Sequence, residues 1–399
     1  AEDRAQFVKI CNELNFKIPK SGMAQDVLQA REIAKGVGYP IICRPSYVLG
    51  GRRMEIVENE EELNSYFERH ANYINSKNPC LMDQFLDKAL EVDVDLVRGQ
   101  DWAIIGGVIE HIERAGVHSG DSMGVLPPQR LKSSVLSEIE RLSLELADKM
   151  QIFGFLNLQL AIRNDEIFML EANPRSSRSV PFIAKASGIP LVDLGVQGML
   201  KKTKSELNYS GKDWKSMPYV CVKGVVFPFK KFQEADSILG PEMKSTGESM
   251  GKGKDYSEAL LKAYVSSNHS MPYDGEVFIS LRDKDKEEFI DVAKDLLNMG
   301  YSLSATQGTA TFLKEKGLPC LQVKKVTEGR PHCVDRIRSG KVAMVINTTS
   351  GKQSIEASFS IRRSCIDYSI PCITEGDAAR SFVIAIKRHF SRDFDTYPL

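Results

Sequence analysis

The sequence predicts a protein of mixed α/β and α+β class, whose last part folds as a doubly wound parallel sheet. Residues 154–173 alternate apolar with polar side chains on either side of a tight turn, which is typical of two antiparallel strands. From Gly275 onward, short apolar runs alternate with segments of helical spacing, which indicates β-α-β units and a parallel sheet covered on both faces. A length of 399 residues suits two to three domains.

Composition and charge exclude several kinds of partner. The 53 Lys and Arg residues balance 53 Asp and Glu residues and form no basic block, so neither nucleic acid nor an anionic membrane is expected as a partner. No stretch approaches the roughly 18 apolar residues of a membrane span, and the first residues do not resemble a signal peptide. The eight cysteines lack metal-binding spacing, which favours reduced thiols and a cytoplasmic protein. Because the chain begins with alanine, we expect it to be a piece of a longer protein.

The first part of the chain predicts a small α+β unit. Apolar residues at helical spacing indicate a short helix within residues 1–22 and a second helix at 24–35. The loop at 45–52 places glycines beside an arginine at a strand end, and both a flap that closes over polyphosphate and a plain hairpin turn explain it. Strands are expected at 39–43, 54–57 and 80–83, and Asn59 is expected to cap a helix at 60–70.

Further strands lead to the hairpin and away from it. The strand expected at 91–97 alternates the acids Glu91, Asp93 and Asp95, which alone is typical of an edge strand with a solvated face. The polar stretch at 266–274 is the best candidate for a domain boundary. Other expected elements are a strand at 103–112, a core helix at 136–150, two short helices between 180 and 199, a strand at 219–227 and a helix at 256–265.

The hairpin carries the residues with the clearest chemistry. A period of two places Glu171 and Asn173 on one face of the second strand, beside Gln159 of the first. One carboxylate and two amide oxygens suit Mg²⁺ that is bound together with phosphate. Arg175 and Arg178 follow at once and could hold the phosphate charge. An ordinary surface hairpin with a charged exit is the alternative.

This hairpin resembles the metal-binding hairpin of the ATP-grasp ligases. The segment L-E-A-N-P-R carries the resemblance, together with Gln159 twelve residues before Glu171. The extension R-S-S-R-S-V-P-F-I-A-K-A-S-G-I-P-L resembles the second synthetase half of the bacterial-type carbamoyl-phosphate synthetase large subunit, and the likeness covers essentially the whole chain. It implies an ATP-grasp fold and a ligase that phosphorylates carbamate with ATP to give carbamoyl phosphate, with Mg²⁺ or Mn²⁺ as cofactor.

The resemblance also implies roles for individual residues. Gln159, Glu171 and Asn173 would hold the metal, and the first two would also contact the nucleotide. The catalytic residues would be Arg44, which also binds phosphate from the lid side, and Arg175 and Arg178, which would orient carbamate and stabilise the transferring group. Relatives usually carry a histidine where this chain has glutamine in the hinge, and glutamine can still hydrogen-bond. The residues implied to hold the nucleoside are Gln84, Leu86, Glu91, Gly116, Val117, His118 and Ser119.

The carboxyl ends of the expected parallel strands form a second candidate site. Ligands bind there in such sheets, and hydroxyls, glycines and helix N-termini can cradle a phosphate. Plain helix capping is the alternative for any single Ser or Thr. The stretch resembles the regulatory domain that is similar to methylglyoxal synthase, without that enzyme's acidic residues, which implies a sensor of UMP or IMP. The residues implied to bind this effector are Ser280, Lys286, Thr306, Thr309, Lys325, Asn347, Thr349 and Lys352.

A separate ornithine site, known in some relatives, is expected to be incomplete in this chain. The resemblance places Glu113, Asp121 and Thr374 in that site, and all three are retained. Gly224 stands where an acid is expected, and Cys372 stands where a tyrosine is expected.

The resemblance implies a domain organisation and a set of partners. An ATP-grasp domain is expected at 1–205, with a lid at about 24–84, then a connection at 206–270 and the regulatory domain, similar to methylglyoxal synthase (MGS), at 271–399. The expected partners are a glutaminase small subunit and the first synthetase half, in arginine and pyrimidine biosynthesis, and a homo-oligomer is left open. Two other interpretations remain: a nucleotide-binding regulatory fragment without turnover of its own, and an ATP-grasp ligase of the biotin-carboxylase or glycinamide-ligase type.

Overall fold

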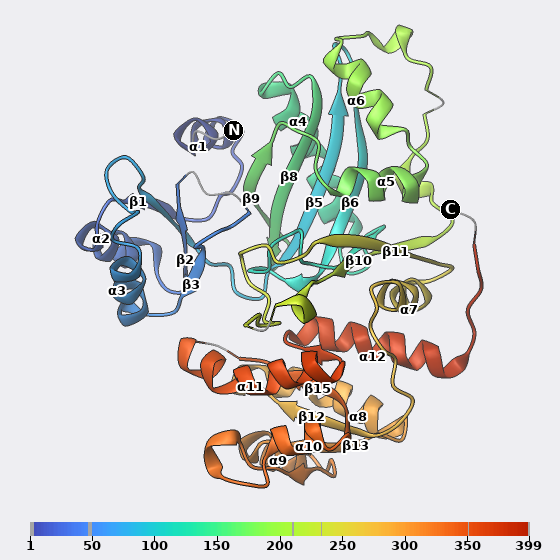
Figure 1. Ribbon diagram of the computed structural model, residues 1–399. Helices are drawn as coiled ribbons and strands as arrows, with labels where there is room; N and C mark the ends of the chain where they lie inside the picture. The colour runs from blue at the N-terminus through green and yellow to red at the C-terminus, as the bar shows by residue number, and fades with distance from the viewer. Residues whose placement is uncertain (1–3, 47–49, 210, 233, 350, 398–399) are drawn as a thin grey trace. The chain divides into compact units, whose positions relative to one another are not determined.

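A computed structural model describes residues 4–46, 50–209, 211–232, 234–349 and 351–397 (Figure 1). Contacts within the chain divide it into two units. The first comprises residues 1–223, 240–243 and 397–399, and the second comprises residues 224–239 and 244–396. The domain limits expected from the sequence, at 205 and 270, stay a prediction.

The first unit begins with helix α1 (Arg4–Glu13) and a small antiparallel sheet. Helices α2 (Val27–Val37) and α3 (Glu60–Arg69) pack against this sheet over a core that includes the fully buried Leu63 and Tyr66 (Figure 1). The strand order is β1-β4-β2-β3, with β1 (Ser21–Ala24), β2 (Ile41–Pro45), β3 (Glu55–Val57) and β4 (Cys80–Gln84).

Local capping explains where the two lid helices begin. The side chain of Asn59 accepts a hydrogen bond from the backbone N–H of Glu62 at 2.9 Å, so the expected N-cap of α3 is confirmed. Helix α2 begins at Val27, later than the expected residue 24. The delay arises because Ala24 pairs with Cys80 in strand β1, and Asp26 then caps the helix.

Six strands of the first unit form its larger sheet, in the order β10-β7-β6-β5-β8-β9, and neighbouring strands run antiparallel. The boundary between the two units falls within β10. The strands are β5 (Leu90–Arg98), β6 (Ala103–Arg114), β7 (Gly124–Leu126), β8 (Gly154–Arg163), β9 (Glu166–Asn173) and β10 (Val220–Val226). The helices that accompany them are α4 (Ser133–Lys149), α5 (Ser179–Ser187) and α6 (Leu191–Met199).

Strands β8 and β9 are the hairpin expected from the sequence, which is therefore confirmed. The turn consists of Asn164 and Asp165, whose φ angles of 54° and 64° lie in the left-handed region that Asn and Asp tolerate better than most residues. Because the turn is only two residues long, the strands run further toward it than the expected four-residue turn allowed.

Strand β5 is not the edge strand that its alternating acids suggested. It lies between β6 and β8, and its residues Asp93 and Asp95 are only 4% and 2% exposed. The interpretation of a solvated acidic face is therefore wrong. Buried carboxylates need partners, and theirs come from strands and loops far along the chain.

The second unit contains a parallel sheet of five strands in the order β14-β13-β12-β15-β16, as the β-α-β pattern predicted. The sheet is preceded by β11 (Gly247–Gly253) and α7 (Tyr256–Ser266), which contact each other. Its strands are β12 (Glu276–Ser280), β13 (Ser302–Ala305), β14 (Leu321–Gln322), β15 (Val342–Asn347) and β16 (Cys372–Ile373). Its helices are α8 (Ile290–Asn298), α9 (Gln307–Glu315), α10 (Cys333–Arg338), α11 (Lys352–Tyr368) and α12 (Gly376–Ser391) (Figure 1).

Within the described part of the chain, no helix is by itself long and apolar enough to cross a bilayer. The pair α5 and α6, bent by 118° at the break between them, passes the same test of length and composition.

Candidate functional site

The three expected metal ligands lie side by side on the hairpin. Gln159 of β8 pairs directly with Glu171 of β9, and the next pair toward the strand end joins Asn157 with Asn173. Directly opposed residues of antiparallel strands share a face, so the carboxylate and the amides point to the same side of the sheet. The register shifts by one residue after the Gln159 pair, so that Leu160 pairs with Met169.

These side chains fit a hard cation. The Nε2 of Gln159 donates a hydrogen bond to Ser119 Oγ at 2.8 Å, which leaves the Oε1 atom of the same amide available as a ligand. The side chain of Glu171 is 41% exposed and supplies the charge. Among the described residues, no three His, Cys, Asp or Glu side chains form a cluster that could hold a metal. One carboxylate with amide and phosphate oxygens is a donor set that suits Mg²⁺.

The Gln159 hydrogen bond also joins the hairpin to the expected nucleotide loop. Within this loop, the N–H of Gly116 donates to Glu91 Oε1 at 3.4 Å, so the acid implied to hold the ribose meets the same loop. Gly116 has a φ of 105°, and an added Cβ would lie 3.0 Å from Ile56 and Phe85. Glycine is therefore required where the loop passes the lid.

His118 is held as a neutral hydrogen-bond donor in this loop. Its Nδ1 accepts from the N–H of Gly120 at 3.0 Å, so its Nε2 carries the proton. Burial lowers the pKa of His118; the carboxylate of Asp121 opposes this effect, and the Arg178 guanidinium adds to it. A neutral imidazole with a free Nε2–H can donate to a ligand across the neutral pH range. Val117, which precedes His118 in the loop, is half-buried.

The expected hinge lies at the end of strand β4. The N–H of Gln84 donates to the carbonyl of Lys20 at 2.8 Å, and Leu86 is 5% exposed. Leu86 belongs to a small apolar cluster with Ala89 and Ala161, against which Ala115 packs from the nucleotide loop. The hinge, the loop and the hairpin therefore meet around one apolar cluster.

Arg44 reaches Glu171, one of the expected metal ligands, from the lid. Its Nη2 lies 2.9 Å from Asp83 Oδ2, and its Nη1 lies 3.5 Å from Glu171 Oε2. Of the loop that follows Arg44, residues 47–49 lie outside the described residues, so the expected flap is described only at its base. There, a Cβ on Gly51 would lie 1.9 Å from the carbonyl oxygen of Pro241.

The two arginines after the hairpin differ in placement. Arg178 Nη2 donates to the carbonyl of Gly120 at 2.9 Å, which places this guanidinium at the nucleotide loop. Arg175 is exposed and donates to the carbonyl of Ser176 at 3.2 Å. The structure brings Arg178 to the expected nucleotide loop, whereas the hydrogen bond of Arg175 is to its own neighbour in the chain.

Sequence reasoning missed a buried network beneath the site. Asp95 accepts hydrogen bonds from Ser177 and Ser179 at 2.6 Å each and from Asn157 at 3.2 Å, which fixes the segment that carries Arg178. Burial raises the pKa of Asp95 to about 6, although these hydrogen bonds oppose the rise. The residue spacing gave no signal for these bonds, because Asp95 and Ser177 are 82 positions apart.

A buried histidine, His111, joins Glu91, the acid expected to hold the ribose, to the sheet. His111 Nε2 lies 3.0 Å from Asp93 and its Nδ1 lies 3.6 Å from Glu91. Burial alone would lower the pKa of His111, but the two carboxylates outweigh it and raise the pKa to about 9.

Lys223, which is 2% exposed, donates from Nζ to the carbonyl of Ser119 at 3.0 Å. A lysine inside the apolar run 219–227 was the only sequence signal of this contact.

The carboxyl ends of the parallel strands in the second unit gather several of the expected effector residues. Ser280 ends β12 and pairs with Asn347 at the end of β15. Thr306 Oγ1 donates to Ser280 Oγ at 3.4 Å, and Thr309 Oγ1 accepts from the N–H of Leu281 at 3.2 Å. Three adjacent strands thus present hydroxyl and amide groups at one edge, at the N-terminus of α9.

Unpaired donors and one lysine mark this edge as a cradle. Asn347 Nδ2 and Thr349 Oγ1 are buried without a hydrogen-bond partner in the structure. Lys286 reaches the same edge, since its Nζ donates to the carbonyl of Gly308 at 3.1 Å. Lys325 is exposed. The side chain of Lys352 lies outside the described residues.

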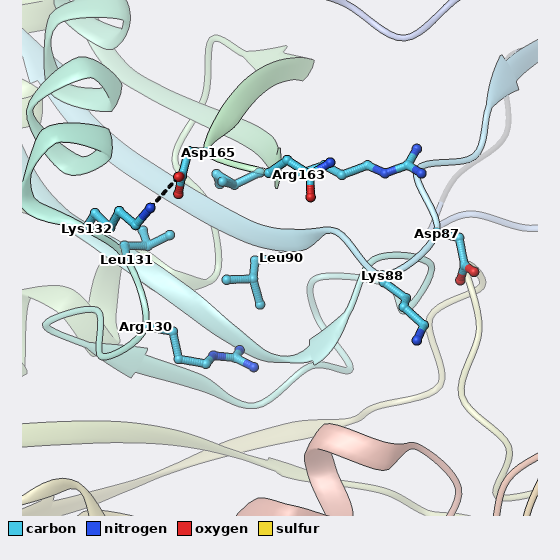
Figure 2. Close-up of a pocket in the computed structure, with 10 residues that line it drawn as sticks. Asp87, Lys88, Leu90, Arg130, Leu131, Lys132, Arg163 and Asp165 are labelled. Atoms are coloured by element: carbon cyan, nitrogen blue, oxygen red, sulfur yellow. Dashed lines mark hydrogen bonds and ion pairs between the residues drawn. The ribbon is translucent and has the colours of Figure 1, made fainter. Parts of the chain in front are cut away.

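A separate pocket of about 420 Å³ lies beside the hairpin turn (Figure 2). Basic side chains dominate its lining, with Lys88, Arg130, Lys132 and Arg163, and Lys132 is paired with Asp165 at 2.5 Å. None of the residues that line it belongs to the expected nucleotide, metal or effector sites.

Comparisons with known proteins agree with this geometry. Residues 3–201 match the family described as the carbamoyl-phosphate synthase L chain, ATP binding domain, and residues 288–374 match the MGS-like domain. The C-terminal section of the carbamoyl phosphate synthase large chain of Methanocaldococcus jannaschii is 43% identical over all of this chain and 66% of its own length. The corresponding section from Aquifex aeolicus is 42% identical over 97% of this chain and 74% of its length. The large chain of Myxococcus xanthus is 44% identical over all of this chain and 37% of its length.

Solved structures show the fold at much lower identity. The biotin carboxylase domain of Hydrogenobacter thermophilus 2-oxoglutarate carboxylase, solved with MgADP and bicarbonate, has a TM-score of 0.52 at 16% identity, over 65% of this chain and 63% of that one. An N5-carboxyaminoimidazole ribonucleotide synthetase with ADP has a TM-score of 0.52 at 15% identity, over 66% of this chain and 70% of that one. The expected ATP-grasp fold and MGS-like domain are confirmed. The chain spans about two thirds of the first relative and about 36–37% of complete large chains.

Proposed function

Because the chain belongs to the family of carbamoyl-phosphate synthase large chains, we propose that it is a ligase that transfers the γ-phosphoryl group of ATP to carbamate, which yields carbamoyl phosphate. This reaction is the last step of the synthesis that the complete enzyme performs. The proposal concerns this chain's own site, since the whole enzyme is longer than the chain.

One observation carries the proposal. The hydrogen bond between Gln159 and Ser119, at 2.8 Å, joins one of the three expected metal ligands to the loop expected to hold the nucleotide. Glu91, the acid proposed to hold the ribose, contacts the same loop through Gly116 at 3.4 Å, which supports a single site for metal and nucleotide. An ordinary surface hairpin would not require these contacts.

The protein's task in such a transfer is positioning and charge stabilisation. Gln159, Glu171 and Asn173 would hold Mg²⁺ or Mn²⁺, which would supply positive charge that offsets the charge of the phosphates. Arg44 lies beside Glu171 from the lid, and Arg178 contacts the expected nucleotide loop at Gly120. Both guanidinium groups can therefore supply positive charge for the transferring group. Arg175 is exposed at the strand exit, where a guanidinium could orient carbamate. No side chain is needed as nucleophile, because a carbamate oxygen attacks directly.

The partners follow from the chemistry of the complete reaction. Carbamate must come from a first synthetase half, and its ammonia from a glutaminase small subunit, in a cytoplasmic pathway to arginine and pyrimidines. The cradle in the second unit would bind UMP or IMP as effector, through a phosphate that Lys286 and the hydroxyl groups can hold. These assignments rest on the family and on the cradle's unpaired donors.

The purified chain can be tested by its formation of ATP from MgADP and carbamoyl phosphate. Steady formation supports the proposal. Binding of MgADP without turnover would instead support a nucleotide-binding regulatory fragment. This interpretation is retained because the chain covers only 36–37% of the length of complete large chains. Absence of both would contradict the site itself. Other ATP-grasp ligases are favoured only by structural likeness at 13–16% identity, which concerns the fold.

A further inference from the structure

A buried carboxylate, that of Asp95, lies beneath the exit of the hairpin. Asp95 belongs to β5, is 2% exposed and pairs in the register with Asn157 of β8. Its Oδ1 accepts hydrogen bonds from Ser177 Oγ at 2.6 Å and from Asn157 Nδ2 at 3.2 Å. Its Oδ2 accepts from Ser179 Oγ at 2.6 Å. Both carboxylate oxygens are therefore occupied, and two of the three donors flank Arg178 in the chain.

The charge of Asp95 fits these donors. Burial raises its pKa to about 6, so the group is mainly a carboxylate at neutral pH and above. A carboxylate can only accept hydrogen bonds, so both serine hydroxyls donate to it. Ser179 is also the first residue of α5, and the positive end of a helix favours a negative charge. Charge-assisted hydrogen bonds thus hold both sides of residue 178.

Arg178, between the two serines, reaches the expected nucleotide loop at a glycine. Its Nη2 donates to the carbonyl of Gly120 at 2.9 Å, and the N–H of Gly120 donates to His118 Nδ1 at 3.0 Å. A Cβ added to Gly120 would lie 2.0 Å from Arg178 Nη2 and 3.2 Å from His118 Nδ1. The guanidinium and the imidazole therefore meet at a residue where a side chain does not fit.

Asp95 lies on the face of the sheet that carries the expected metal ligands. Strand β8 pairs Gln159 with Asp93 and Asn157 with Asp95, and directly opposed residues share a face. Residues two apart on a strand share it as well. Because protein donors occupy both of its oxygens, Asp95 serves this face by orienting its neighbours, and not as a further ligand.

We propose that Asp95 is a positioning residue for phosphoryl transfer, which acts on Arg178 through the two serine hydroxyls. Because Gly120 joins Arg178 to His118, the same acid also sets the place of that neutral donor. The inference rests on the proposed function, since it takes Arg178 and the loop at 116–119 to serve the phosphates. Residues that act through one another have non-additive effects on a rate, which gives the inference a specific signature.

A double-mutant cycle on the full chain tests this signature, with ATP formation from MgADP and carbamoyl phosphate as the assay. Asp95→Asn keeps the size of the side chain but removes its charge, and should lower kcat by about tenfold. Arg178→Ala should lower kcat at least as far. When Asp95→Asn is added to Arg178→Ala, kcat should fall by less than about twofold more, because the group that Asp95 positions is already absent.

Two serine variants separate positioning from a general loss of buried hydrogen bonds. Ser179→Ala removes one donor to Asp95 and should lower kcat in the wild type but not in the Arg178→Ala background. Ser143→Ala is the matched control. It removes another buried hydroxyl of the first unit, which donates to the carbonyl of Ile139 within α4 at 2.7 Å, and it should keep the wild-type kcat.

The outcomes distinguish this inference from the proposed function. A wild-type kcat in folded Asp95→Asn and Ser179→Ala proteins, or a second tenfold loss in the Arg178→Ala background, would overturn the inference while the reaction stands. If the wild-type chain binds nucleotide without turnover, the proposed function fails, and the same cycle is then measured on the dissociation constant for MgATP. If Asp95→Asn does not fold, Ser179→Ala completes the cycle in its place.

Discussion

The guanidinium of Arg44 lies 3.5 Å from the carboxylate of Glu171, which joins a lid strand to the strand that carries the expected metal ligands. The same guanidinium is 2.9 Å from Asp83, whose side chain is 5% exposed. Arg44 is therefore oriented by a buried acid toward the place where phosphate charge is expected.

The first prediction follows from the two contacts of Arg44, with Asp83 and with Glu171. Arg44→Lys keeps the charge but lacks the planar pair of donors that can serve Asp83 and Glu171 together, so phosphoryl transfer should fall by roughly tenfold or more while the fold is retained. Rates of ATP formation from MgADP and carbamoyl phosphate measure the effect. Arg69→Lys is the matched control, because Arg69 makes a two-bond pair with Glu55 on the same lid, at 2.7 and 2.8 Å. Equal rates in both variants would contradict the role of Arg44.

The second prediction concerns the buried imidazole. Burial alone would lower the pKa of His111, but Asp93 and Glu91 raise it from 6.5 to about 9. The folded state therefore keeps a proton that the unfolded state releases above pH 6.5. Its stabilising contribution is therefore complete below pH 6.5 and is lost as pH rises through 9. Between pH 7.5 and 9 it should decrease by on the order of 1–2 kcal/mol, and His111→Gln should lose this dependence.

Urea unfolding at several pH values measures this difference. The neighbouring Glu113, whose pKa burial raises to about 7, titrates mostly below that range and remains in both proteins. A variant with the same slope between pH 7.5 and 9 as the wild type would show that His111 is not the titrating group.

The third prediction concerns effectors. UMP should bind the full chain, and Lys286→Met should weaken it by about tenfold or more, since a charge-assisted hydrogen bond contributes roughly 1.5–3 kcal/mol. Ornithine should not bind at micromolar strength. At Gly224, where an acid is expected for ornithine, an added Cβ would lie 2.3 Å from Ser267 Oγ and 2.4 Å from Ser249 Oγ, so the packing leaves no room for a carboxylate. Titration calorimetry decides, and micromolar ornithine binding or absent UMP binding would refute it.

The fourth prediction concerns the complete reaction. Purified chain that is given bicarbonate, ammonia and ATP should form no carbamoyl phosphate, because the sequence contains one ATP-grasp hairpin and the carbamate must come from another. Addition of carbamoyl phosphate and MgADP to the same preparation should produce ATP, which controls for inactive protein. Net synthesis from bicarbonate would contradict the need for a first synthetase half.

The sequence was sufficient for the elements that local periodicity determines. A period of two placed Glu171 and Asn173 on one face, and the register bears this out, since Gln159 and Glu171 are direct partners. The cap at Asn59 is equally local. The three strand ends of the cradle followed from β-α-β order, since parallel strands end at one edge.

Elements that depend on distant partners could not be predicted in this way. Strand β11 has the sequence G-E-S-M-G-K-G, which lacks the β-branched and aromatic residues typical of strands. The local pattern indicated a solvated Asp95, because its partners Ser177 and Ser179 lie more than 80 residues away in the sequence. Arg362 and Asp236 form a hydrogen-bonded ion pair although they are 126 positions apart, and neither stands in a motif. Long-range hydrogen bonds leave no periodic trace in sequence.

The central claim is that Glu171 holds the metal for phosphoryl transfer, and one rate comparison tests it most directly. Glu171→Gln removes the charge from the expected ligands and keeps the side chain's size, so ATP formation from MgADP and carbamoyl phosphate should fall by at least about a hundredfold. Glu166→Gln, on the same strand but paired with Lys17 at the exposed turn, should keep the wild-type rate. A folded Glu171→Gln protein with a rate close to that of Glu166→Gln would contradict the account.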